Sequence, residues 1–78
     1  MPRLPRITGG ELVGALEKAG FLVTRQRGSH VQVRREEADG TVRTFPVPVH
    51  GRKTIKSGTL RGILRLAGMS VEQLSELL

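Results

Sequence analysis

Apolar residues repeat at helical spacing near both ends of this sequence, whereas β-branched residues dominate the middle. The helical patterns cover residues 8–20 and 58–68, and a shorter one follows from residue 70. Between them lie three short segments, bounded by Gly28-Ser29 and by EEADG at residues 36–40. This α-β-β-β-α-α order predicts an α+β fold, a three-stranded antiparallel sheet with the helices packed on one face and the other face open.

Two capping boxes predict where the outer helices begin. Thr8 is followed three residues later by Glu11, and Ser70 by Gln73, so each hydroxyl can accept an orphan backbone N–H while the longer side chain reaches back. The residues expected to form the apolar helix faces are Leu12, Val13, Leu16, Ala19, Leu60, Ile63, Leu64, Ala67, Val71, Leu74, Leu77 and Leu78.

Strand periodicity separates the second β segment into two faces. Val31 and Val33 share one face and His30, Gln32 and Arg34 share the other, because side chains alternate along a strand. The valines are the better core residues, so His30 is expected to point outward. The third strand is expected to turn Phe45 and Val47 to the core, with Pro46 and Pro48 limiting pairing at its edge.

Charge is the strongest global signal. The 78 residues carry 13 Lys+Arg against 7 Asp+Glu, a net charge of +6. No acidic residue lies between Asp39 and Glu72, and a one-sign stretch of this kind suits a phosphate backbone. The bases in that stretch are Arg43, Arg52, Lys53, Lys56, Arg61 and Arg65. The alternatives are a solvated basic face or a surface that meets an acidic protein.

Composition limits the chemistry. There are no cysteines and only 2 histidines, and the acidic residues of EEADG fall in a turn where carboxylates are usually just solvated. We therefore expect no metal and no cofactor. The 2 phenylalanines are the only aromatic residues, which argues against RNA recognition by stacked aromatic platforms. With no apolar run of membrane-spanning length, the expectation is one cytoplasmic domain over residues 1–78.

His30 is the best catalytic candidate. An imidazole near neutral pH can accept a proton from a ribose 2′-hydroxyl, which then attacks the adjacent phosphate and cleaves RNA. Neighbouring cations would stabilise the charge that builds on the phosphate. The alternative is that His30 is only a polar residue on an exposed strand. The residues expected to contact phosphates are Arg25, Arg27, Ser29, Arg34, Lys53, Lys56 and Thr59.

Two further features lie between the third strand and the second long helix. His50 could protonate the leaving 5′-oxygen, or it could be a structural hydrogen-bonder that fixes the turn at residues 48–51; we favour the structural role. The start of the helix offers free N–H groups to an anion. The alternative there is an ordinary N-cap by Ser57 or Thr59.

Three short motifs in a fixed order resemble the HicA family of toxin proteins. They are Gly-Ser-His at residues 28–30, Pro-Val-His at 48–50 and Gly-Thr-Leu at 58–60, and the likeness runs over roughly residues 7–77. The resemblance implies a double-stranded-RNA-binding-like fold and a ribonuclease that cleaves mRNA without the ribosome and so inhibits translation. It also implies that His30 is the catalytic histidine and that a HicB-like antitoxin covers the active site.

Two other classes of function stay open at this point. A non-catalytic RNA-binding module could use the same sheet and helix, and would leave RNA intact. A protein-interaction adaptor with a basic face would show little salt-sensitive affinity for RNA.

Overall fold

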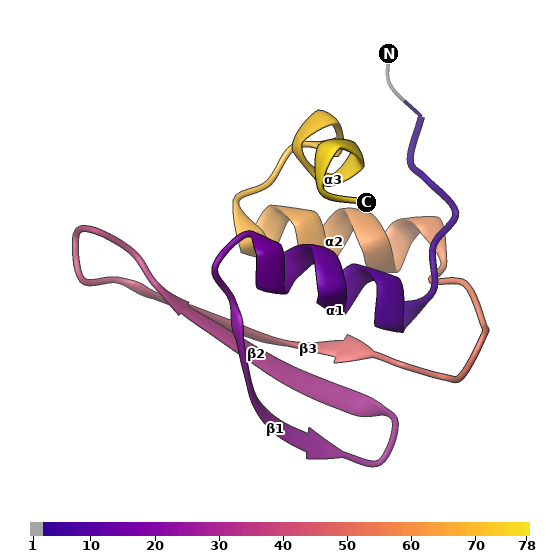
Figure 1. Ribbon diagram of the computed structural model, residues 1–78, viewed down its shortest axis with the longest axis horizontal. Coiled ribbons are helices and arrows are strands. Elements are labelled where there is room, and N and C mark those ends of the chain that lie inside the picture. The colour runs from indigo at the N-terminus through magenta and orange to yellow at the C-terminus, as the bar shows by residue number, and fades with distance from the viewer. Residues whose placement is uncertain (1–2) are drawn as a thin grey trace.

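The computed structural model describes residues 3–78 as a three-stranded sheet with three helices (Figure 1). The elements occur in the predicted order. They are α1 (Gly9–Lys18), β1 (Leu22–Arg27), β2 (His30–Glu36), β3 (Val42–Pro48), α2 (Ser57–Ala67) and α3 (Val71–Leu77). The sheet is antiparallel in the order β1-β2-β3, which places β2 in the centre.

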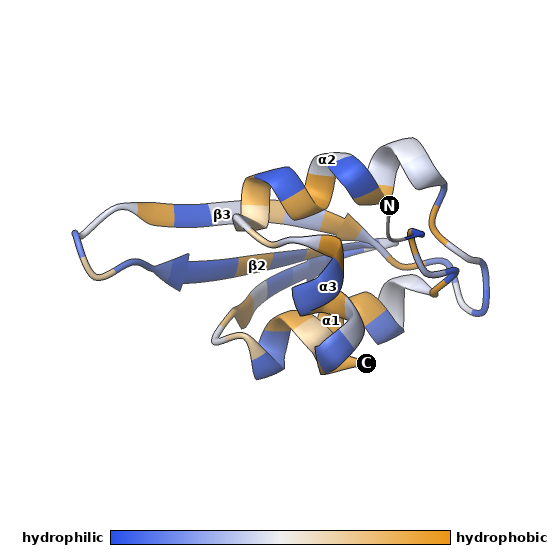
Figure 2. Ribbon diagram, turned by 90° about the horizontal axis from the view of Figure 1, so that it is seen from above, coloured by the Kyte–Doolittle hydropathy of each residue, from blue (hydrophilic) through white to orange (hydrophobic). Residues whose placement is uncertain are grey.

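The helices lie on one side of the sheet, as predicted, and leave its other face open (Figure 1). α1 and α2 pack against the strands, and α3 packs against α1 on the side away from the sheet. Leu74 of α3 is 0% exposed, so the last helix belongs to the core of its own fold. In Figure 2, hydrophobic positions recur along α1 and α2 and are interspersed with hydrophilic ones along the strands.

Both predicted capping boxes are present. The Thr8 hydroxyl accepts from the Glu11 N–H at 3.2 Å, and the Glu11 carboxylate accepts from the Thr8 N–H at 2.9 Å. Ser70 and Gln73 make the same pair of bonds at 3.1 and 2.8 Å. Each box satisfies backbone donors that the helix itself leaves unpaired.

The core fills the space between the sheet and the helices. Val31 and Val33 of β2 face inward, as do Phe45 and Val47 of β3, which confirms the predicted register of both strands. Phe45 meets Phe21 edge to face, with ring centroids 5.3 Å apart. The other buried apolar residues are Ile7, Leu12, Ala15, Leu16, Leu60, Ile63, Leu64, Ala67 and Leu74.

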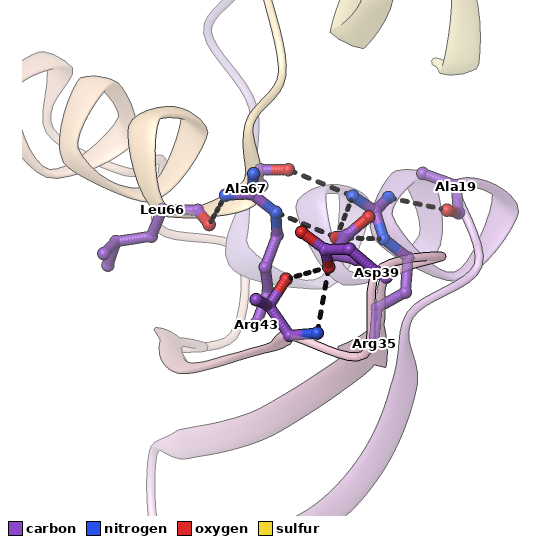
Figure 3. A network of polar contacts seen from close by, with 8 residues as sticks. Ala19, Arg35, Asp39, Arg43, Leu66 and Ala67 are labelled. Atoms are coloured by element: carbon purple, nitrogen blue, oxygen red, sulfur yellow. Dashed lines mark hydrogen bonds and ion pairs between the residues drawn. The ribbon is translucent and has the colours of Figure 1, made fainter.

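Arg35 joins the ends of two helices to the sheet (Figure 3). Its guanidinium donates to the Ala19 carbonyl at 2.9 Å and to the Ala67 carbonyl at 3.3 Å, at the C-terminal ends of α1 and α2. It also donates to Glu37 Oε1 at 2.8 Å and lies 4.4 Å from the centre of the Phe21 ring. A cation suits this place because unpaired carbonyls make a helix C-terminus negative.

Arg43 shares the same carboxylate (Figure 3). Its Nε lies 2.8 Å from Glu37 Oε1 as an ion pair, and its Nη1 donates to the Leu66 carbonyl at 2.9 Å. Arg43 is therefore tied to Glu37 and to the end of α2, although its side chain stays 39% exposed, and it differs in this from the other bases of the basic stretch. Asp39 accepts from the backbone and hydroxyl of Thr41, so EEADG is an organised turn. The expectation of a solvated carboxylate was wrong for Glu37, which is half-buried between two arginines, whereas Asp39 is exposed.

Candidate nucleic-acid interface

The turn before β2 fixes the start of the strand that carries His30. Gly28 and Ser29 connect β1 to β2, and only Gly28 has a positive φ, +58°. A two-residue hairpin loop with glycine in its first position has this pattern, and its twist matches that of the strands. His30, the first residue of β2, is exposed on the open face of the sheet, as predicted.

An irregularity in β1 brings two arginines to the same face. Val23 pairs with Val33 and Arg25 with Gln32, so Thr24 is an extra residue, a β-bulge. Beyond the bulge the side chains exchange faces, which turns Arg25 and Arg27 to the open side. Arg27 lies directly opposite His30. Strict alternation from Val23 would instead have placed both arginines on the covered face.

Four side chains on this open face enclose a shallow cavity of about 390 Å³, which we call the His30 hollow. Arg25, Arg27, His30 and Gln32 line it, so the fold gathers the candidate base and two predicted phosphate ligands. Gln32 was not among the predicted site residues, although its spacing from His30 already placed it on this face. Its amide donates to the Thr44 hydroxyl at 2.9 Å, which orients it.

The other two predicted contacts on these strands lie outside the His30 hollow. Arg34 is on the open face beyond Gln32, with Nη2 4.0 Å from the Glu36 carboxylate. Ser29 is half-buried in the turn, and its carbonyl accepts from the Val49 N–H at 2.6 Å.

A second cavity of about 310 Å³ lies between the end of β3 and the start of α2; we call it the α2 hollow. Its lining residues are Pro48, His50, Lys53, Thr54, Ile55, Lys56 and Thr59. The fold thus brings together Lys53, Lys56 and Thr59, three of the residues predicted to contact phosphates. The N-cap of α2 is Lys56, whose side chain makes no capping bond, so the alternative of a cap by Ser57 or Thr59 was wrong.

Pro48 lines the α2 hollow and lies next to His30, which lines the other hollow. Pro48 pairs with His30 across the β2–β3 ladder, so the two side chains share the open face. The end of β3 is also fixed from behind by α1. A side chain on Gly9 would collide with the Pro48 carbonyl, so α1 can approach this closely only with glycine there.

The chain was compared with known protein families and with curated proteins. A family model described as HicA toxin of bacterial toxin–antitoxin matches residues 9–69, more than three quarters of the sequence. This chain belongs to the HicA toxin family. HicA toxins are generally known as mRNA interferases, and a toxin of this kind implies an antitoxin partner. No curated protein matches the sequence.

The matched region of this HicA toxin runs from α1 to just beyond α2 and contains both hollows. It includes Gly28, His30, His50 and Thr59, residues of the three motifs that carried the resemblance. It ends before α3, although Leu74 of that helix is buried. Membership therefore rests on the part of the chain that builds the candidate site.

His50 of this toxin stands at the rim of the α2 hollow. The turn after β3 is held by its carbonyl, which accepts from the Lys53 N–H at 3.0 Å. The side-chain hydrogen bonds of residues 3–78 do not involve its ring, which is exposed. Backbone bonding thus fixes the turn and leaves the imidazole accessible to a ligand.

Among residues 3–78, no acidic residue lines either hollow. The pKa of Glu37 is below its ordinary value because Arg35 donates hydrogen bonds to the carboxylate, and the pKa of Asp39 is lowered by its bonds from Thr41.

Across residues 3–78, no three histidine or acidic side chains gather as they would around a metal ion. Over the same residues, no helix has the length and apolar character needed to cross a bilayer.

Proposed function

We propose that this HicA toxin is an endoribonuclease that cleaves mRNA without a metal, with His30 as the general base and residues 1–78 acting as one domain. The observation that carries the proposal is the His30 hollow: an exposed imidazole beside Arg25 and Arg27, on a sheet face that no helix covers. A base needs access to its proton, and a phosphate needs positive charge; this hollow offers both.

The chemistry follows from one proton transfer. An imidazole nitrogen of His30 takes the proton of a ribose 2′-hydroxyl, and the 2′-oxygen attacks the adjacent phosphorus. The bond from phosphorus to the 5′-oxygen then breaks, and the 5′-oxygen takes up a proton from water or from an imidazolium. The products are a 2′,3′-cyclic phosphate and a free 5′-hydroxyl. DNA, which lacks the 2′-hydroxyl, is not cleaved.

Cations on either side of His30 hold the phosphates. Arg27, directly opposite His30, and Arg25 stabilise charge on the phosphate in the transition state, where fixed donors act most strongly. Lys53 and Lys56 bind a flanking phosphate at the uncapped start of α2. The backbone is thereby bound at two places, one on each side of Pro48.

The experiment that tests the function is cleavage of a short single-stranded RNA in excess chelator. Wild-type protein should produce a cyclic phosphate end, detected by mass spectrometry, and His30→Ala should not. Gln26→Ala is the matched control, because Gln26 is exposed on β1 but lies opposite Val31 on the other face. Full activity of His30→Ala would place the chemistry elsewhere, and loss of wild-type activity in chelator would indicate a metal. RNA that is bound but never cut would favour a non-catalytic RNA-binding module.

We also propose a HicB-like antitoxin as the partner, seated over the open face of the sheet. Arg25, Arg27 and Arg34 are exposed there, so an acidic surface would complement it. Adding the antitoxin should stop cleavage, and charge reversal at Arg25 should weaken the complex. An antitoxin that binds while leaving the His30 hollow active would contradict this placement.

A further inference from the structure

We propose that the α2 hollow seats the base of a nucleotide next to the cleaved phosphate, which would give this toxin a sequence preference at that position. The inference rests on the proposed ribonuclease function, and it assigns a role to a cavity that the proton transfer at His30 leaves unused. Binding sites for small groups are usually preformed clefts with apolar walls and a few placed polar groups. The α2 hollow has this make-up.

The walls suit a flat ring. Pro48 and Ile55 are half-buried and supply apolar surface, and Ile55 packs against the hydrophobic core behind it. The imidazole of His50 also lines the hollow, and no side-chain hydrogen bond within residues 3–78 holds it elsewhere. Unstacked RNA bases are commonly bound by stacking on such rings. An unpaired base can therefore be covered on one face by the proline and isoleucine and on another by His50.

Polar groups at the hollow suit the edge of a base. Thr54 and Thr59 both line it and are exposed, and each hydroxyl is a donor and an acceptor. Lys53 and Lys56 lie beside them and supply positive charge for the phosphate of the same nucleotide. Within the described part of the chain, no carboxylate lines the cavity, which suits a polyanion.

The hollow is held rigid by the N-terminal segment. Thr54 forms an isolated bridge with Thr8, and the Ile55 N–H donates to the Ile7 carbonyl at 2.8 Å. Gly9 packs against the carbonyl of Pro48 on the opposite wall. A cavity that is already shaped loses little freedom when a ligand enters, which favours selective binding.

The position of the hollow decides which nucleotide it holds. Pro48 lines the α2 hollow and is the direct cross-strand partner of His30. RNA with its reacting ribose at His30 and its backbone following the basic loop must pass Pro48 next. The base that enters the α2 hollow therefore belongs to one of the two nucleotides that flank the cleaved bond.

The experiment uses full-length His30→Ala protein, which binds without cutting, and a set of short single-stranded RNAs, each lacking the base at one position. Fluorescence anisotropy should show one position where removing the base weakens binding about 5- to 150-fold, the effect expected for one stacked base. His50→Ala and Thr59→Val should abolish this positional effect. Ser57→Ala should preserve it, because Ser57 is exposed in the same helical turn and does not line the hollow.

Cleavage mapping with wild-type protein on the same RNA locates the sensitive base relative to the cut. A sensitive base more than one nucleotide from the cut would overturn the inference. Equal affinity for all base-deleted RNAs would also overturn it, while wild-type cleavage would continue to support the ribonuclease. The protein could also show a positional effect that needs His50 and Thr59 and yet never cleave RNA. That result would support binding of a nucleotide base in the α2 hollow and overturn the proposed ribonuclease.

Discussion

His30 and Pro48 face each other across the β2–β3 ladder in a pair that exchanges no backbone hydrogen bonds. The Val49 N–H donates to the Ser29 carbonyl at 2.6 Å, so the backbone hydrogen bond is formed by the residues next to His30 and Pro48 and not by that pair itself. Side chains of such pairs approach more closely than those of hydrogen-bonded pairs, with Cα atoms about 4.5 Å apart. The candidate general base thus stands beside a lining residue of the α2 hollow.

Replacing Gly9 should disturb the His30–Pro48 pair from behind. In Gly9→Ala the new methyl group collides with the Pro48 carbonyl, so α1 or the end of β3 must shift. We expect a loss of about 1–3 kcal/mol in the free energy of unfolding, as in other overpacked sites, with slower RNA cleavage. Gly10→Ala is the control, because a methyl group on Gly10 would have the Thr8 hydroxyl, at 3.9 Å, as its nearest contact. Thermal denaturation that shows Gly9→Ala to be as stable as Gly10→Ala would refute the contact.

Glu37 should make stability depend on pH. The pKa of its carboxyl is lowered by the hydrogen bonds from Arg35, so its contribution is present above its ordinary, unfolded-state value and is lost as pH falls through the folded-state value. Glu37→Gln should melt at a lower temperature than wild type at pH 7, and the difference should shrink on acidification.

Glu36→Gln is the matched control for that experiment. Glu36 has a side chain that is 62% exposed and reaches Arg34 only at 4.0 Å, so it should melt close to wild type. A Glu37→Gln difference that stays constant down to strongly acidic pH would show that the carboxylate charge does not stabilise the network.

The last helix should be needed for stability even though it lies outside the matched family region. Leu74→Ala removes a fully buried side chain and should cost about 2–5 kcal/mol. That is a large share of the stability of a domain this small. Leu78→Ala, at a residue that is 48% exposed, should cost far less. Urea unfolding that finds the two variants equal would mean that α3 does not pack on α1 in solution.

Arg25 and Arg27 should make the salt-dependent contacts with RNA. In the His30→Ala background, removing either arginine should weaken binding and flatten the slope of log affinity against log salt by about 0.7, the value for one phosphate of a single strand. Arg65→Ala is the control, because Arg65 lies in the last turn of α2, away from both hollows. Equal changes in all three variants would indicate a diffuse basic surface instead of a defined site.

Local pattern determined much of this fold. Apolar spacing and the two capping boxes were enough to predict the element order, both outer helices and the inward faces of β2 and β3. They also placed His30 outward, because Val31 and Val33 have to be buried and alternation leaves His30 on the opposite face. Each of these features depends on residues a few positions apart.

Pairing between distant segments decided the rest. The extra residue at Thr24 turned Arg25 and Arg27 toward His30, and the β2–β3 register set Pro48 opposite it. The charge pattern groups Arg43 with the other bases of its stretch, whereas Glu37 and the end of α2 hold it in the fold. The sequence by itself determined which residues could serve as base and cations. Only the tertiary structure decided which of them share a hollow, because a strand's register and an arginine's counter-ion depend on chain segments that the local pattern does not contain.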